Sequence, residues 1–165
     1  MAALTVGTKA PEFELTTLDG KRFVLSNALS RGPVVLAFFK VSCPVCQFAF
    51  PYLERLYKAY RQQGYTLVGI SQNDAKESSA FNKEFGVTFP VLLDELSRYP
   101  VSNAYGLTNV PTLFLIQPDG TIAASFTGFD KQGLEGISAS FAAHVGKPIS
   151  PVFQPGESVP DHKPG

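Results

Sequence analysis

Short apolar runs alternate with segments of helical periodicity along this chain, which is the pattern of an α/β domain. The run at 33–39 is too short for a buried helix and predicts a buried strand, as in a parallel sheet. Apolar residues then recur at helical spacing from Pro44 onward, so the pattern predicts a helix that ends at Gly64. A second apolar strand over 65–71 completes a βαβ unit with a right-handed crossover.

Turn signals divide the rest of the chain into further elements. Residues 13–18 and 22–25 flank Asp19-Gly20, a dipeptide that tolerates positive φ, and this predicts a β-hairpin added at the N-terminus. A parallel first half and an antiparallel second half predict an α/β fold with a mixed central sheet flanked by helices. The other predicted elements are a helix over 75–85 between Asp74 and Gly86, an apolar segment over 89–94, a brief helix over 100–105, a strand over 113–116, a strand over 121–126 whose Ile122, Ala124 and Phe126 face inward, and a helix after Asp130.

The length and apolar content allow one well-packed domain. The chain has 165 residues, 44% of them apolar, and no internal repeat is visible. We expect a single domain over 1–146. From 147 to 165 prolines interrupt any periodicity and polar residues dominate, which predicts an extended C-terminal tail. This tail either lies along the domain through Ile149, Val152 and Phe153 or is disordered.

Charge and hydropathy argue against several classes of function. The formal net charge is zero and no basic run is present, which argues against a nucleic-acid surface and a polybasic membrane anchor. The small charged cluster at 94–98 is typical of a solvated loop. No apolar stretch reaches the roughly 20 residues of a membrane span, and the N-terminus lacks a basic start followed by an apolar core. The chain as given is therefore expected in the cytoplasm, although a trimmed exported or periplasmic protein would show the same features.

The two cysteines of the chain, Cys43 and Cys46, lie at the start of the first predicted helix. Pro44 suits a first helical turn, so Cys43 is at the N-terminal edge, where the helix dipole and free backbone N–H groups stabilise a thiolate. Residues three apart on a helix face each other, so Cys46 can reach the Cys43 sulfur and close a disulfide. The spacing predicts a redox-active pair in which one cysteine attacks and the other resolves, with no cofactor beyond that disulfide.

Zinc binding and a structural disulfide are the other uses of such a pair. A tetrahedral zinc site needs four ligands, and the other soft donors, His144 and His162, lie far along the chain. A disulfide between residues three apart closes too small a loop to constrain the unfolded chain much. Redox chemistry accounts better for the pair, and we expect no metal site.

Several short motifs taken together resemble one family. They are GTKAPEF at 7–13, LDGK at 18–21, Cys43-Pro44-Val45-Cys46, Pro51 behind the second cysteine, Val110-Pro111-Thr112, and Pro118-Asp119-Gly120. Over residues 5–145 the chain resembles the thioredoxin fold. Within that fold it is similar to the redoxin group, related to AhpC/TSA proteins, that includes TlpA-like and ResA-like thiol-disulfide oxidoreductases.

The resemblance implies an activity and a substrate surface. In that family the proline equivalent to Pro111 is cis and lies against the disulfide, and the residue before it, here Val110, offers backbone hydrogen bonds to a bound substrate chain. Pro44 and Val45 belong to the same substrate-contacting surface. The expected reaction is attack by the first cysteine on a target disulfide, followed by displacement by the second. The expected partners are protein or small-molecule thiols and disulfides and an electron-donating reductase, and the chain is expected to be a monomer.

Three residues near the cysteines depart from the family or carry an unusual charge. Ser42 stands where most relatives have a tryptophan, so the rim of the site should be less apolar. Ala37 stands where thioredoxin has a buried acid that exchanges protons with the second cysteine, so water or another group must take that role. Lys40 is a candidate for tuning the ionisation of Cys43 or for screening a bound anion. The alternative is a lysine whose stem packs while its head reaches solvent.

Two rival functions remain open. Motifs at 10–13 and 89–94 occur in similar form in peroxiredoxins, which also use a reactive cysteine. That family places a threonine or serine three residues before its peroxidatic cysteine, where this chain has Lys40. The other rival is a module that binds a metal or a client protein without catalysis, as Sco-like copper chaperones do with a wider cysteine spacing and a well-placed histidine.

Overall fold

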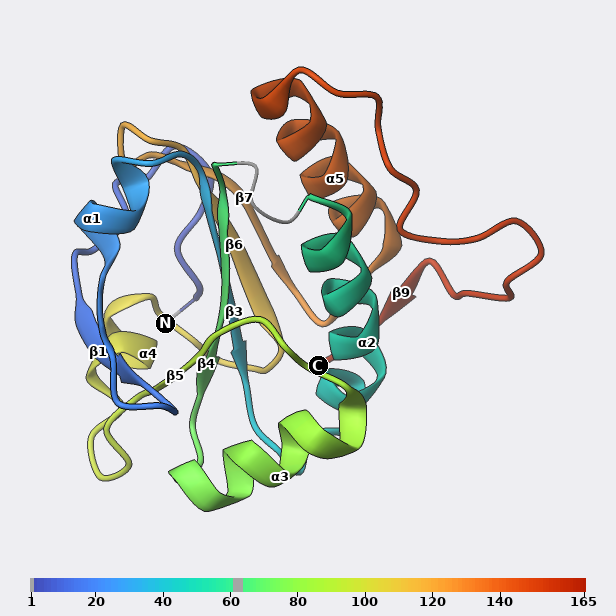
Figure 1. The fold of residues 1–165 in the computed structure, drawn as a ribbon. Helices are drawn as coiled ribbons and strands as arrows, with labels where there is room; N and C mark the ends of the chain where they lie inside the picture. Colours follow the sequence, from blue (N-terminus) through green and yellow to red (C-terminus); the bar gives the residue numbers. More distant parts are fainter. Residues whose placement is uncertain (1, 61–63) are drawn as a thin grey trace.

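The computed structural model describes residues 2–60 and 64–165, and in them a mixed sheet runs through the middle of the molecule (Figure 1). The elements are β1 (Glu14–Thr17), β2 (Arg22–Val24), α1 (Leu25–Leu29), β3 (Val34–Phe39), α2 (Pro44–Ala59), β4 (Thr66–Ser71), α3 (Ala75–Phe85), β5 (Val91–Leu93), α4 (Pro100–Ala104), β6 (Thr112–Ile116), β7 (Ile122–Thr127), β8 (Phe129–Asp130), α5 (Lys131–Val145) and β9 (His162–Lys163). Within these residues the seven strands of the sheet follow the order β2-β1-β5-β4-β3-β6-β7.

The pairing of the strands confirms the predicted mixed sheet and its added hairpin. β3, β4 and β5 pair in parallel, whereas β6 pairs antiparallel with β3, and β7 with β6. β1 and β2 form the antiparallel N-terminal hairpin, and β1 also pairs antiparallel with β5. The hairpin therefore extends the sheet at the edge opposite β7.

Helices cover both faces of the sheet, which explains why β3 reads as an unbroken apolar run. α2, α3 and α5 lie over one face, and α1 and α4 lie over the other (Figure 1). Every residue of β3 is buried, because alternate side chains enter a different core on each face. The side chains toward α2 are Val35, Ala37 and Phe39, and those toward α1 are Val34, Leu36 and Phe38.

A bulge in the last antiparallel pair overturns one prediction. Leu115 pairs with Ala124, but the next residue, Ile116, pairs with Ile122, so Ala123 is left over. An extra residue shifts the alternation of side chains by one position, so the residues just before and just after it point to opposite faces of the sheet. Ile122 therefore packs in the core under α1 and α4, while Ala124 and Phe126 pack against the core under α2. The prediction that these three side chains face the same way is wrong.

The structure also revises two helix boundaries. Leu25, predicted at the end of the hairpin, begins α1 and is buried with Leu29. α2 ends at Ala59, because Tyr60 leaves the helical region with φ −118° and ψ 19°, so the predicted end at Gly64 is wrong. Residues 61–63 lie outside the described part of the chain. Among the described residues, no helix is both long and apolar enough to cross a bilayer.

The predicted starts of α3 and α5 are confirmed by their caps. The Asp74 carboxylate accepts the N–H of Glu77 at 2.8 Å, and the Asp130 carboxylate accepts the N–H of Gly133 at 2.8 Å. Each satisfies a backbone donor that has no partner inside its helix. Gly86 ends α3 in the left-handed conformation, as predicted.

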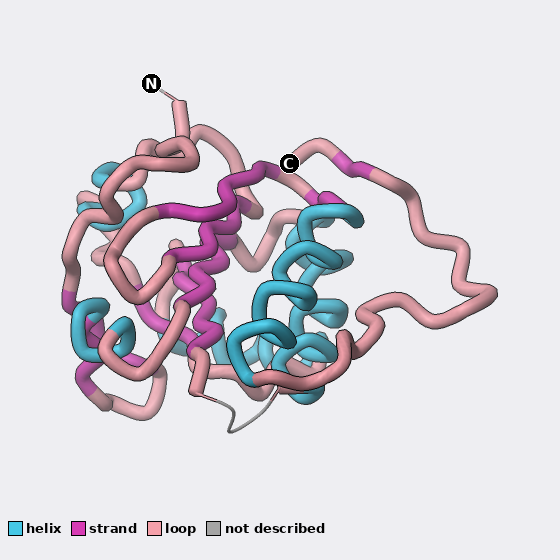
Figure 2. Tube along the Cα trace, turned by 90° about the horizontal axis from the view of Figure 1, so that it is seen from above, coloured by secondary structure: helices cyan, strands magenta, loops and turns pink. Residues whose placement is uncertain are grey.

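The tail after α5 lies along the outer side of α2 and α5 and returns to the sheet side of the molecule (Figure 2). Val152 is 3% exposed, and the Phe153 ring lies against Tyr52 with the ring centres 5.0 Å apart. Ile149, by contrast, is 62% exposed and does not anchor the tail. Near its end, β9 pairs antiparallel with β8.

Candidate active site

Cys43 is the N-terminal cap of α2. Its carbonyl oxygen accepts the N–H of Gln47 at 3.0 Å, and its Sγ accepts the N–H of Cys46 at 3.2 Å. Pro44 follows as the first helical residue, where the N–H that it lacks would have had no partner. The Cys43 sulfur therefore receives one of the unpaired donors at the positive end of the helix, an arrangement that favours negative charge on sulfur.

Cys46 has the opposite environment. Its side chain is 0% exposed, whereas Cys43 is only half-buried. Burial raises the pKa of the Cys46 thiol well above its ordinary value, and the hydrogen bond with Cys43 raises this pKa further. The two sulfurs therefore differ in access and in charge preference, although both are free thiols in this structure.

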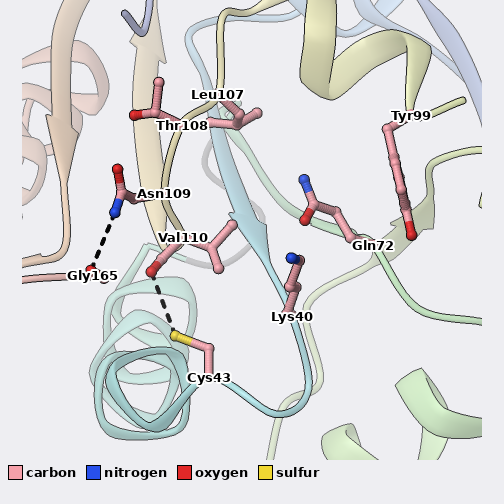
Figure 3. Close-up of a pocket in the computed structure, with 9 residues that line it drawn as sticks. All are labelled: Lys40, Cys43, Gln72, Tyr99, Leu107, Thr108, Asn109, Val110 and Gly165. Atoms are coloured by element: carbon pink, nitrogen blue, oxygen red, sulfur yellow. Dashed lines mark hydrogen bonds between the residues drawn. The ribbon is translucent and has the colours of Figure 1, made fainter.

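The segment before β6 brings a backbone carbonyl to the pair. The Val110–Pro111 peptide bond is cis, as the resemblance implied. The Cys43 thiol donates to the Val110 carbonyl oxygen at 3.4 Å (Figure 3). Gly128, after β7, donates its N–H to the Pro111 carbonyl at 2.7 Å and so holds this segment against the sheet. The Val110 carbonyl can accept a hydrogen bond only from the thiol form of Cys43, whereas the Cys46 N–H can donate to the thiol or to the thiolate.

The predicted contact residues between the cysteines lie in the same turn but differ in exposure. Pro44 is exposed beside Cys43, and Val45 is half-buried and packs against the core under α2. The structure thus places Pro44 and Val45 beside the pair and Val110 and Pro111 across from it.

A cavity of about 420 Å³ opens beside Cys43 on the side away from α2 (Figure 3). Lys40, just after β3, extends into it between Val110 and Gln72, and carries the one charged side chain among the residues that line it. No carboxylate among the described residues lies within ion-pairing distance of its ammonium group. The cavity is lined by Lys40, Cys43, Gln72, Tyr99, Leu107, Thr108, Asn109, Val110 and Gly165.

Sequence reasoning missed most of the residues that line this cavity. Gln72 could have been found, because it follows β4 as Lys40 follows β3, and the carboxyl ends of parallel strands meet at one edge of a sheet. The Gln72 side chain donates to the Ser102 hydroxyl at 2.9 Å, which fixes its position. Tyr99 adopts the left-handed conformation with φ 48° before α4, and Gly165 comes from the tail. No local pattern indicated either of these.

The histidines lie in different parts of the molecule. His162 is in β9, with its Nε2 atom 3.4 Å from the Thr127 carbonyl oxygen. His144 is in the last turn of α5. Within residues 2–60 and 64–165, no group of three or more histidine, cysteine, aspartate or glutamate side chains could hold a metal ion.

A helix-capping cysteine, a buried partner in the first turn of the same helix and a cis-proline segment across from them define a thioredoxin-fold thiol-disulfide oxidoreductase. Comparison with known proteins agrees with this class. The family model described as "AhpC/TSA family" matches residues 6–125, and the chain belongs to that family.

Individual relatives carry the same chemistry in their names. Thiol-disulfide oxidoreductase ResA of Geobacillus thermodenitrificans is 35% identical over 127 residues, which cover 76% of this chain and 71% of that protein. The crystal structure of a putative thiol:disulfide interchange protein DsbE from Chlorobium tepidum is 25% identical with a TM-score of 0.74, over 87% of this chain and 99% of that one. The solution structure of a putative protein disulfide isomerase from Bacteroides thetaiotaomicron has a TM-score of 0.79 at 24% identity, over 89% and 96% of the two chains, and shows the fold alone.

Proposed function

We propose that Cys43 is the attacking nucleophile of this oxidoreductase and Cys46 the resolving cysteine. The observation that carries the assignment is the contrast between them: Cys43 is half-buried at the cavity and accepts a helix N-terminal N–H, whereas Cys46 is buried and has a raised pKa. A target disulfide can reach the first sulfur but not the second. The thiolate is the reactive form, and the helix N-terminus favours it at Cys43.

The reaction follows in two exchanges. The Cys43 thiolate attacks one sulfur of the target disulfide, a mixed disulfide forms, and the other target sulfur leaves as a thiolate that takes up a proton. Cys46 then loses its proton and attacks the Cys43 sulfur. This step closes the Cys43–Cys46 disulfide, reduces the target to two thiols and oxidises the enzyme by two electrons. The same steps in reverse oxidise a dithiol.

In the described part of the chain, no carboxylate acts on the Cys46 thiol at short range and could accept its proton. The groups that act on the Cys46 thiol are Cys43 and backbone groups of Lys40 and Cys46 itself. Ala37, where thioredoxin has an acid, packs in the core under α2. Water that enters through the cavity beside Cys43 is therefore the acceptor that we propose.

Val110 and Pro111 form the other side of the substrate site in this proposal, with Pro44 and Val45 completing it. The Val110 carbonyl already hydrogen-bonds the Cys43 thiol, so a substrate chain laid along Val110 would bring its own sulfur next to Cys43. We infer protein or small-molecule thiols and disulfides as substrates and a separate reductase as electron donor. We expect the protein to be a monomer. We expect it to act in the cytoplasm, or in an exported setting if a leader has been removed.

Stopped-flow oxidation of the reduced protein tests this function. A protein disulfide should oxidise the reduced chain, and Cys43→Ser should abolish the reaction. Hydrogen peroxide reacting orders of magnitude faster than the disulfide would instead make the chain a peroxidase. The described residues that line the cavity include no arginine and one threonine, Thr108, and Lys40 stands three residues before Cys43. Nothing in that described lining favours peroxide chemistry.

A further inference from the structure

The end of the tail lies directly beside the proposed substrate site. β9 pairs antiparallel with β8, and the Lys131 N–H donates to the Asp161 carbonyl at 3.0 Å just before β9. Beyond β9, the Asn109 side chain donates to the Gly165 carbonyl oxygen at 3.3 Å, next to Val110 (Figure 3). The tail residues Asp161 to Gly165 lie outside the 6–125 segment that the family model matches.

Two glycines allow this part of the tail to contact the backbone of the site. A Cβ atom at Gly165 would lie 2.4 Å from the Val110 carbonyl oxygen, closer than real Cβ contacts permit. A Cβ atom at Gly128 would lie 2.3 Å from the Lys163 carbonyl oxygen, and Gly128 also has φ +81°. The tail therefore occupies the edge formed by Gly128 and Val110, the same edge along which an extended substrate chain would lie.

The middle of the tail is fixed to α2 by side chains. Arg55 makes a two-pronged ion pair with Glu157, at 2.7 and 2.8 Å, and also donates to the Val152 carbonyl at 3.2 Å. The Lys163 ammonium group lies 4.9 Å from the centre of the ring of Phe48, two residues after Cys46 in α2. A segment held at several points over its length is a stable occupant of this edge.

The other approach to Cys43 remains open. The cavity beside Lys40 reaches the Cys43 sulfur without passing the β8–β9 pair, and Gly165 forms part of its wall. A cavity of about 420 Å³ suits a small molecule better than a folded protein surface. The ammonium group of Lys40, which forms no ion pair with the described residues, favours an anionic small molecule.

We propose that residues 161–165 select the substrate: they occupy the edge that an extended protein chain needs, while small anionic disulfides reach Cys43 through the cavity beside Lys40. This rests on the proposed roles of Cys43 and Val110. A protein disulfide must then wait for the tail to leave, so its rate scales with the fraction of molecules whose tail is undocked. The rate with a small disulfide does not depend on that fraction.

A charge reversal at the Arg55–Glu157 pair tests the proposal in the full chain. Glu157→Lys should release the tail, which protection of the Lys131 amide against hydrogen exchange reports. We expect the rate with a disulfide in an unfolded protein chain to rise about fivefold. A change of this size is what the loss of one exposed ion pair, together with repulsion between Arg55 and the new lysine, would produce. The rate with oxidised glutathione should stay within about twofold. The double variant Arg55→Glu, Glu157→Arg restores the pair and should restore both the protection and the slow protein rate.

Gly165→Val is the second variant, because its side chain meets the Val110 carbonyl directly. It should raise the protein-disulfide rate in the same way without any change of side-chain charge; because Gly165 also lines the cavity beside Lys40, the glutathione rate is compared in Glu157→Lys alone. The proposal is overturned if the protein-disulfide rate is unchanged in both variants, or if the glutathione rate of Glu157→Lys rises by the same factor as its protein-disulfide rate. Failure of the proposed catalytic roles looks different, since neither disulfide would then react with the wild-type chain in a way that Cys43→Ser abolishes.

Discussion

Replacing Asp94 by alanine should destabilise the protein more than any surface change near the site. Asp94 follows β5 and is 2% exposed. One carboxylate oxygen accepts the N–H groups of Glu95 at 3.0 Å and Val101 at 3.2 Å, and the other accepts the N–H and the hydroxyl of Ser102 at 2.8 and 2.7 Å. The carboxylate thus satisfies the first free donors of α4, which lie within the core.

The size of the effect follows from those bonds. Without the carboxylate, the buried N–H groups of Val101 and Ser102 lose their acceptor, and each unsatisfied buried group costs about 1–3 kcal/mol. We expect a loss of about 4 kcal/mol in the free energy of unfolding. For a chain of this length that lowers Tm by roughly 8–16 °C. Because Ser102 also receives the Gln72 side chain, the lining of the cavity beside Cys43 should loosen as well.

Thermal unfolding of the reduced protein, followed by circular dichroism, measures this loss. Asp94→Asn should lose about half as much, because its amide keeps one acceptor oxygen. Glu95→Ala is the matched control: its carboxylate lies in an exposed ion pair, 3.9 Å from Arg98, and its loss should change the stability by less than about 0.5 kcal/mol. A loss below about 1 kcal/mol for Asp94→Ala would show that the Asp94 bonds do not hold α4 in place.

Two further predictions concern charge at the tail and at the cavity. The hydrogen bonds from Arg55, and then the one from the Gln154 N–H, lower the pKa of Glu157 to about 2. The ionised Glu157 therefore stabilises the docked tail above the ordinary pKa of 4.5, and this stabilisation is lost as the pH falls toward 2. Protection of the Lys131 amide against hydrogen exchange should fall between these two pH values, and Glu157→Gln should remove this pH dependence. If the wild type and Glu157→Gln show the same pH profile, Glu157 ionisation does not control tail docking. Lys40→Gln should slow the reaction with anionic oxidised glutathione about threefold at low salt and should not slow the reaction with cationic cystamine. Lys40→Arg should react as the wild type does. Equal slowing of both disulfides by Lys40→Gln would exclude a charge effect.

The sequence predicted the elements whose signals are local. The apolar run of β3 and the turn residues around α3 each act through nearest neighbours, so the strand, the cap at Asp74 and the stop at Gly86 all lie where the pattern placed them. The start of α2 at Pro44, with Cys43 as its cap, follows in the same way. The cis Val110–Pro111 peptide bond was predicted from the family resemblance, because a peptide bond before proline is more often trans when nothing else is known.

The features that the sequence did not predict depend on contacts between distant segments. The bulge at Ala123 is a property of the β6–β7 pair and leaves no mark on the alternation within one strand. Asp94 stands in a cluster typical of solvated loops, yet the return of α4 buries it. The composition of the tail allows disorder, and contacts with distant residues, among them Arg55 and β8, fix the tail beside the site.

The central claim is that Cys43 attacks and Cys46 resolves, and trapping the mixed disulfide tests it most directly. Reduced Cys46→Ser and Cys43→Ser chains would each be mixed with a protein disulfide, quenched with acid and analysed by intact mass. We predict that the Cys46→Ser chain retains the target protein on Cys43 and that the Cys43→Ser chain captures none. Capture by Cys43→Ser with none by Cys46→Ser would reverse the two roles, and capture by neither would contradict the account of the site.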